Sequence, residues 1–209
     1  MYIYKLTADS GCAPCVDGEL LTLAICKPRI RRGAQAGDLL IGFAGSELSP
    51  DNRLIYIARV TAVEDDGGYY DKPTYRDRRD WIYVRRADGR FEVRAGARCQ
   101  GTEEDLQHDL GTFPHYEKAR VLVSEDFRYF GRSGGLDLRP YPALRQRLQG
   151  VGIRDFQVNH PPELESELRS LCDQLGRTIP RRAVGTPRAS DGSARGECHA
   201  PSPARRTCG

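Results

Sequence analysis

The chain has 209 residues, 39% of them hydrophobic, and a formal net charge of +3 from 32 basic and 29 acidic side chains. This length allows one domain with a core of its own plus a tail. No stretch approaches the roughly 20 apolar residues of a membrane span, and residues 1–11 lack the apolar centre of a signal peptide. We therefore expect a soluble cytoplasmic protein without membrane contact.

Short strands dominate the first two thirds of the expected structure. The clearest pattern is a β-hairpin made of the apolar segment 39–45, a turn-rich loop and segment 53–64, which is rich in β-branched and aromatic residues. Segment 20–26 is an apolar run that fits a buried strand or a short helix. Further strands are expected at 2–6, 81–84, 91–94 and 119–124.

Helical patterns lie at 102–110, 141–148 and 162–175. The last has one stripe of leucines, Pro162 in its first turn and Gly176 as its expected stop. Strands followed by helices indicate an α+β fold. We predict a small, strongly bent mixed sheet or open β-barrel with flanking helices.

The end of the sequence differs in composition from the rest. Residues 181–209 contain no aromatic residue, and six arginines stand against two acids. Such a segment cannot bury enough apolar surface to offset the entropy of ordering it. We therefore divide the chain into a domain at 1–178 and a disordered tail at 179–209, rich in Arg, Pro, Gly and Ser.

Cys12 and Cys15 form a C-x-P-C pair that allows three interpretations. A redox pair needs a following helix, whereas Val16, Asp17 and Gly18 have the composition of a turn. A zinc site needs four ligands, usually as two pairs. We favour a loop with small buried thiols and expect no metal; Cys99 is isolated in the sequence, and the seven cysteines form no disulfide framework.

Catalytic motifs are few. The sequence has no dinucleotide-binding glycine motif, no phosphate loop and no His-Glu-x-x-His. Residues 131–135, GRSGG, fit the nucleophile-elbow pattern, but the following LDLRPYP cannot start a helix promptly, so we expect a glycine loop. No cofactor is expected.

Two basic segments stand out. The first holds Lys27, Arg29, Arg31 and Arg32, which would form a row of phosphate contacts on an extended chain. The second, 75–98, holds eight arginines against four acids, interleaved with aromatic residues. Arginine with aromatic faces is what base stacking and backbone contact require. The alternative is that these arginines pair with the neighbouring acids.

A series of motifs, in order, resembles the nucleotide-modification-associated domain family of the second type. The motifs are Asp9-x-Gly11, TLAICKPRIR at 22–31, Gly37-Asp38, YYDKP at 69–73 and DFRYFG at 126–131, within residues 1–150. The resemblance implies a link to systems that hypermodify bases in bacterial or phage DNA. Members often carry another residue where Cys15 stands, which argues against an obligatory cysteine pair.

A second resemblance concerns architecture. GDLLIGFAG at 37–45, followed by LIYIARVTAVE at 54–64, resembles the strand pair of PUA-like and EVE-like base-reading barrels. Such folds hold one extruded base in an aromatic cage. The resemblance implies a cage of Tyr69, Tyr70, Trp81 and Tyr83, with the cations of 27–32 on the backbone.

We therefore expect a non-catalytic protein that binds DNA or modified nucleotides, recognises modified or unusual bases, and works with other proteins of a modification system. The alternative is an enzyme of nucleotide or base modification, with Asp9, Asp71 or Lys27 in acid or base roles. A third possibility is a scaffold whose arginine-rich tail recruits a partner.

Overall fold

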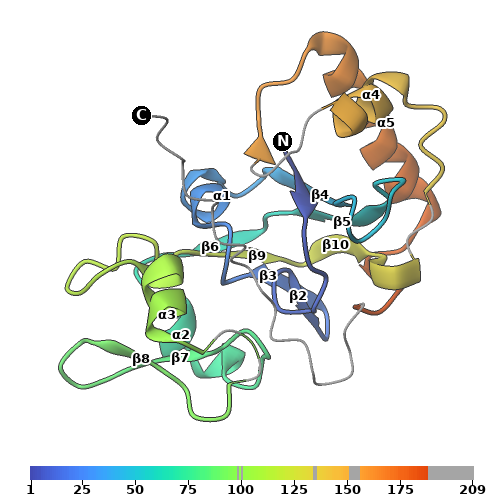
Figure 1. Cartoon of the computed structure of the whole chain (residues 1–209). Helices are drawn as coiled ribbons and strands as arrows, with labels where there is room; N and C mark the ends of the chain where they lie inside the picture. The colour runs from blue at the N-terminus through green and yellow to red at the C-terminus, as the bar shows by residue number, and fades with distance from the viewer. Residues whose placement is uncertain (98, 100, 134–135, 151–155, 188–209) are drawn as a thin grey trace, which may run out of the picture.

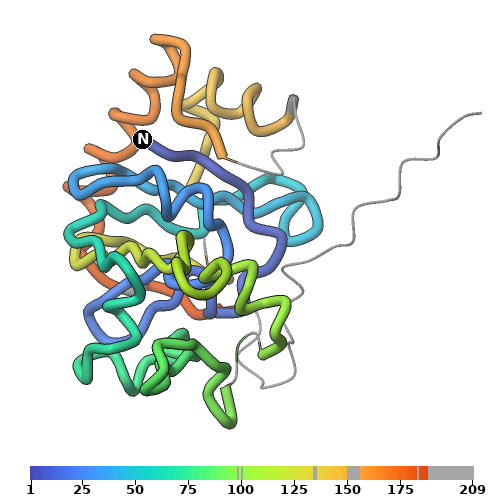
Figure 2. Tube along the Cα trace, turned by 90° about the vertical axis from the view of Figure 1, so that its left-hand side faces the viewer, coloured from blue at the N-terminus to red at the C-terminus, as the bar shows by residue number. Residues whose placement is uncertain are grey.

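The computed structural model describes residues 1–97, 99, 101–133, 136–150 and 156–187. Its elements stack in layers, visible from two directions in Figures 1 and 2. Two helices lie on one side, a six-stranded sheet follows, a four-stranded sheet comes next, and a small lobe with a two-stranded sheet lies at the far end.

The six-stranded sheet has the order β11-β1-β4-β5-β10-β12. β1 and β4 are parallel, β4 and β5 form an antiparallel hairpin with an irregularity at Gly42/Phe43, and β10 continues antiparallel to β5. The strands are β1 (Tyr2–Leu6), β4 (Leu39–Ala44), β5 (Leu54–Arg59), β10 (Asp126–Tyr129), β11 (Phe156–Gln157) and β12 (Arg182–Ala183).

The four-stranded sheet has the order β2-β3-β9-β6, with every pair antiparallel. Its strands are β2 (Cys15–Asp17), β3 (Leu20–Leu23), β6 (Ala62–Glu64) and β9 (Val121–Ser124). The remaining hairpin, β7 (Tyr83–Arg85) with β8 (Phe91–Val93), belongs to the lobe.

Five α-helices and two 3-10 turns occur among the described residues. The helices are α1 (Pro28–Gly33), α2 (Gly68–Asp71), α3 (Glu103–Leu110), α4 (Pro142–Gly150) and α5 (Pro162–Thr178), and the turns are η1 (Pro73–Tyr75) and η2 (Gly131–Ser133). α3 starts at a capping box in which Thr102 and Asp105 exchange hydrogen bonds. α5 starts with proline and buries one stripe of leucines.

Strand alternation assigns each side chain to a layer. Ile3, Ile41 and Ile57 face the leucines of α4 and α5. The opposite face of the same sheet packs on β3 and β9. In β9, Leu122 points into this space between the sheets, while Val121 and Val123 pack against the lobe. The four-stranded sheet therefore has an apolar layer on each side.

Several sequence predictions are confirmed. The β4–β5 hairpin forms, and the helical patterns correspond to α3, α4 and α5. Other predictions are wrong. Gly176 does not stop α5, which continues to Thr178 and ends at extended Ile179, before Pro180. Val16 and Asp17 belong to β2 rather than to a turn.

The predicted barrel is also wrong. The described strands form three separate sheets, and none closes on itself. β10 and β9 follow each other in the chain but pair in different sheets, so the two larger sheets stack face to face instead of curling into one barrel. The predicted similarity to PUA-like and EVE-like barrels is not confirmed.

The segment assigned to the tail is only partly described. Residues 179–187 include β12, which pairs in parallel with β10, and Val184 donates to the Tyr129 carbonyl at 2.8 Å. Residues 188–209 lie outside the described residues. Within the part that is described, no helix is both long and apolar enough to cross a bilayer.

Candidate functional site

A row of tyrosines crosses the six-stranded sheet on the face that meets the four-stranded sheet. The strand register places Tyr4 beside Gly42, Gly42 beside Tyr56, and Tyr56 beside Tyr129. A methyl group at Gly42 would overlap the Tyr56 ring and the Leu6 side chain. The glycine therefore leaves room for the Tyr4 and Tyr56 hydroxyls to meet at 2.5 Å.

Asp9, in the loop after β1, lies at one end of this row. The Tyr129 hydroxyl donates to Asp9 Oδ1 at 2.6 Å, while Oδ2 is buried and has no hydrogen-bond partner. The side chain is 3% exposed. Burial raises the pKa of Asp9, although the Tyr129 hydrogen bond and the charges of Arg53 and Arg132 oppose the rise.

Lys27 approaches the same row from a strained segment of backbone. Cys26 and Lys27 both adopt the left-handed conformation, with φ of 56° and 44°, before α1 begins at Pro28. Non-glycine residues rarely adopt this conformation, and such strain concentrates at functional sites. The Lys27 ammonium lies 5.3 Å from the centre of the Tyr4 ring.

Two of the three acid or base candidates therefore lie near Tyr4. Burial raises the pKa of Tyr4 well above its usual value, and the Asp9 charge contributes to that rise. Lys27 thus lies over the Tyr4 end of the row, and Asp9 is bonded to Tyr129 at the other end. Asp71 lies elsewhere, exposed at the end of α2 and paired with Arg85 at 3.1 Å.

The cations of 27–32 do not form the expected extended row, because residues 28–33 are the helix α1. Pro28 occupies its first turn, where proline is favoured. The Arg29 guanidinium lies 5.4 Å from the centre of the Phe156 ring, and Arg29 and Arg32 are exposed. Lys27 is half-buried.

Arg31 is the exception, because its side chain does not lie at the surface where a phosphate contact was expected. The side chain is fully buried and donates to the backbone carbonyls of Cys26, Asp109, Lys118 and Arg120. These bonds tie α1 to α3 and to the chain entering β9. Because its donors are occupied by carbonyls, Arg31 has a structural role.

The four predicted cage residues gather in one cluster, but the cluster is closed. Tyr69, Tyr70, Trp81 and Tyr83 belong to the apolar core of the lobe, and none presents an open ring face. The tyrosine hydroxyls are also occupied: they donate to Asp80, to the Ala24 carbonyl and to Asp109. The three tyrosines therefore pack and brace the lobe.

Trp81 differs from these tyrosines. It is 5% exposed, and the guanidinium groups of Arg76 and Arg94 lie 5.8 and 5.3 Å from its ring centre. Its indole Nε1 is buried and has no acceptor in the described structure. A buried indole N–H usually has a partner, so the unpaired Nε1 distinguishes Trp81 from the three tyrosines.

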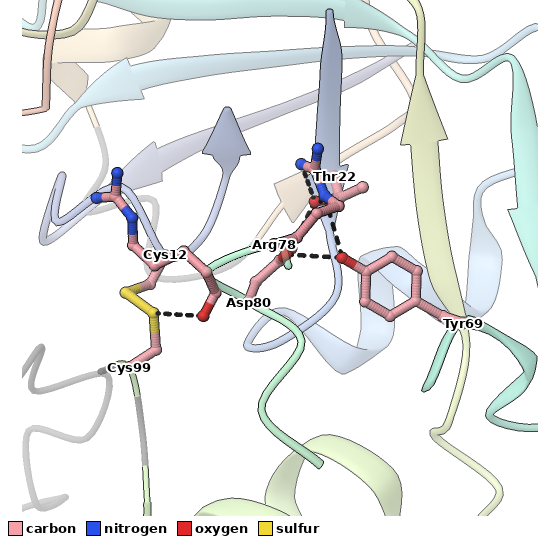
Figure 3. The surroundings of a disulfide bond; sticks show 7 residues. Cys12, Thr22, Tyr69, Arg78, Asp80 and Cys99 are labelled. Carbon is pink, nitrogen blue, oxygen red and sulfur yellow. Dashed lines mark hydrogen bonds and ion pairs between the residues drawn. A yellow bond between two sulfur atoms is a disulfide. The ribbon is translucent and has the colours of Figure 1, made fainter. Parts of the chain in front are cut away.

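Asp80 is the centre of a buried network below the four-stranded sheet (Figure 3). It accepts from the Thr22 and Tyr69 hydroxyls at 2.5 and 2.7 Å, and Arg78 lies 3.6 Å away. Arg78 also donates to carbonyls of Cys15, Asp17 and Leu20. In this part of the second basic segment, an arginine pairs with a neighbouring acid, which was the alternative to nucleic-acid contact.

A disulfide joins Cys12 to Cys99, across a separation of 87 residues (Figure 3). Two predictions are therefore wrong: Cys12 is not a buried thiol, and Cys99 is not isolated. Cys15 does have a buried thiol, at the start of β2, and burial raises its pKa to about 12. The C-x-P-C pair is not a redox pair in this structure, because Cys12 is bonded elsewhere.

A family model described as nucleotide modification associated domain 2 matches residues 1–189. The chain belongs to the nucleotide modification associated domain 2 family. This match confirms the resemblance seen in the sequence and extends it past residue 150. No curated protein and no solved structure matches the chain.

The sequence did not single out the tyrosine row of this nucleotide modification associated domain. Tyr129 stands in a motif quoted for the family resemblance and Tyr56 in a strand quoted for the architectural one, but a single sequence does not indicate that their strands are neighbours. Asp9 and Lys27 were named as candidates, without a common location. Their signal was chemical, since both are charged residues within otherwise small or apolar motifs.

Proposed function

We propose that this nucleotide modification associated domain binds DNA and recognises a modified or unusual base within a modification system, together with other proteins of that system. Membership of the family supports the link to modification. The chemistry of two regions supports the binding: the surface cations of α1 and the Arg76–Trp81–Arg94 stack.

The observation that carries the proposal is Trp81. Two guanidinium groups lie over the Trp81 ring, and a base ring can take the place of one of them on the indole. The unpartnered Nε1–H then donates to an acceptor on the base edge, which discriminates between bases. Tyr69, Tyr70 and Tyr83 belong to the same buried cluster as the indole and do not touch the base.

Lys27, Arg29 and Arg32 supply the phosphate half of the site. All three carry charge at or near the surface of α1, and Arg31 holds that helix in place. Backbone contacts of this kind position a nucleic acid without reading its sequence. We expect each of them to contribute about one unit to the slope of log affinity against log salt concentration.

The base contact is tested with Trp81→Phe, which retains an apolar ring and removes the N–H. Binding of oligonucleotides with ordinary and modified bases is measured by fluorescence anisotropy. Loss of one hydrogen bond, worth about 1 kcal/mol, should reduce the ratio of the affinities for modified and ordinary bases by about fivefold. Tyr141→Phe is the control, because it removes one polar atom from a buried ring among α4 and α5. Unchanged discrimination in Trp81→Phe would exclude Trp81.

The phosphate contacts are tested separately with Arg29→Gln and Arg32→Gln. Each change should weaken binding of every oligonucleotide alike and lower the slope of affinity against salt. Arg169→Gln is the control, since this exposed arginine on α5 pairs with Glu165, four residues before it on the same helix. If the slope of affinity against salt is the same in the wild type and in all three variants, α1 is not part of the interface.

The enzyme alternative has one specific observation in its favour, the buried Asp9 carboxylate with a free Oδ2 beside Tyr129. A carboxyl with a raised pKa next to a tyrosine hydroxyl offers a group for proton transfer. We expect a mass change in nucleotides or DNA incubated with the protein, abolished by Asp9→Asn. Unchanged substrate masses would rule against this alternative.

A further inference from the structure

A second cationic site lies on the other face of the six-stranded sheet, away from α1 and Trp81. There the C-terminal half of α5 and strands β5 and β10 line an open cavity of about 340 Å³. Its charged lining consists of four arginines and two acids: Arg59, Arg128, Arg177, Arg181, Asp126 and Asp173. The lining therefore has an excess of two positive charges.

One carboxylate serves three of these arginines. Asp126 lies 2.7 Å from Arg128, 3.1 Å from Arg181 and 3.6 Å from Arg59. Each guanidinium has five N–H donors, whereas one carboxylate has about four acceptor positions. Arg128 also donates to the Ile179 carbonyl, and Arg59 to the Gly37 carbonyl. The arginines that line the cavity therefore have more donors than Asp126 and these two carbonyls can accept from.

The neighbouring helix end attracts cations but does not account for all of them. The C-terminus of α5 carries a partial negative charge of about one half, and Arg177 stands in its last turn. That partial charge together with Asp126 and Asp173 still falls short of four guanidinium groups. The remaining charge favours an anion.

We propose that this cavity is a phosphate-binding site, filled by the phosphate group of a nucleotide or nucleic acid strand. Arginine forks match the geometry of phosphate oxygens and bind them through paired hydrogen bonds. A cavity of this volume lies within the range of small-ligand sites, so it holds a phosphate with part of its nucleoside. The site deepens the proposed function, on which its ligand class rests, but it uses different residues.

Replacing Asp126 tests the site, because a phosphate site and a purely structural cluster predict different changes in phosphate affinity. In a phosphate site, Asp126 competes with the ligand for the same arginines, so Asp126→Asn should increase phosphate affinity by about tenfold. If the cluster only stabilises the fold, the same change lowers stability and leaves phosphate affinity unchanged. The double variant Arg59→Gln/Arg177→Gln should weaken binding by at least about tenfold.

Binding is measured by calorimetry on the full chain, with inorganic phosphate, a nucleoside 5′-monophosphate and a short single-stranded oligonucleotide as separate ligands. Arg169→Gln, outside the cavity on the same helix, is the matched control. Binding of phosphate or the monophosphate that rises in Asp126→Asn and falls in the double variant supports the site. If the oligonucleotide competes, a strand phosphate is the occupant; if it does not, the occupant is a free nucleotide.

Equal affinity in wild type and double variant, or no binding of any of the three ligands, would overturn the site. This failure is distinguishable from failure of the proposed function. Trp81→Phe, Arg29→Gln and Arg32→Gln leave the cavity intact, so the proposed function can fail while phosphate still binds there. Conversely, the double variant can lose phosphate binding and retain base discrimination.

Discussion

Individual residues of the same type have opposite roles in this protein. Arg31 and Arg32 are neighbours in one basic run, yet one is fully buried on backbone carbonyls and the other is exposed. Asp9 and Asp71 were both acid or base candidates, yet only Asp9 is buried with an unpartnered oxygen. Residue type indicates the chemistry that is available, and burial decides how it is used.

Arg31 and Arg32 give the first prediction at this scale. Arg31→Gln leaves several carbonyls without their donor and the buried Asp109 carboxylate without its cation, so the free energy of unfolding should fall by about 3–5 kcal/mol. Arg32→Gln changes an exposed side chain and should alter stability by less than about 0.5 kcal/mol. Denaturant unfolding measures both. Similar stabilities for the two variants would contradict the structural role of Arg31.

Asp9 gives a prediction on pH. Because burial raises its pKa, the folded protein holds the Asp9 proton more tightly than the unfolded chain does. The contribution of Asp9 to the free energy of unfolding therefore falls as pH rises from the unfolded value, about 3.9, through the raised value. Asn does not ionise, so Asp9→Asn removes this loss of stability at high pH.

The variant should therefore gain stability relative to wild type at neutral pH, and the gain should shrink towards pH 4. Urea unfolding of both proteins at the two pH values measures the difference. A difference that grows in acid would show that Asp9 is stabilised as a charged carboxylate, and one that does not depend on pH would show that folding leaves its pKa unchanged.

At the scale of elements, one glycine decides how the central strands pack. Gly42 lies between Tyr4 and Tyr56 in the row that crosses β1, β4 and β5, and the rings of the row fill the space above it. Gly176, within α5, has open space around the position of a side chain. The same substitution should therefore have opposite effects at the two sites.

Gly42→Ala forces the Tyr56 ring and Leu6 to move, and overpacking of this kind costs about 1–3 kcal/mol. Gly176→Ala adds a helix-forming residue without a clash and should stabilise the protein by about 0.5–1 kcal/mol. Thermal and denaturant unfolding measure both changes. A neutral Gly42→Ala would mean that the tyrosine row tolerates rearrangement.

At the scale of the whole molecule, the layers are joined by few covalent or ionic links. The disulfide connects the loop that follows β1, which also carries Asp9, to the far lobe. It lies next to the buried Asp80 network, so a covalent bond and a set of hydrogen bonds hold the same junction. The bond therefore fixes the loop of the tyrosine row relative to the lobe of Trp81.

The disulfide prediction follows from the long separation of its cysteines. Removing it with Cys12→Ser/Cys99→Ser should lower the free energy of unfolding by about 2–4 kcal/mol, because the unfolded chain regains freedom. Reductant should lower the free energy of unfolding of the wild type to that of the double variant, and it should leave the double variant unchanged. Cys172→Ser is the control: this cysteine is outside the disulfide, so the variant should lose as much stability in reductant as the wild type does. A wild type indifferent to reductant would contradict the bond.

The sequence by itself determined the elements whose signals are local. The β4–β5 hairpin follows from two apolar segments around a turn-rich loop, and α5 follows from its leucine stripe and Pro162. The ordered motifs also determined the family. Each of these depends on residues close together in the chain.

Only the tertiary structure decided which of the candidate residues meet. Tyr4, Tyr56 and Tyr129 lie side by side because β1, β4, β5 and β10 are neighbours, and strand order is not encoded in any one segment. The same holds for Cys12 with Cys99, for the three arginines around Asp126, and for the burial of Arg31. Contacts between distant residues follow from packing of whole layers, so periodicity and spacing in a single sequence cannot predict them.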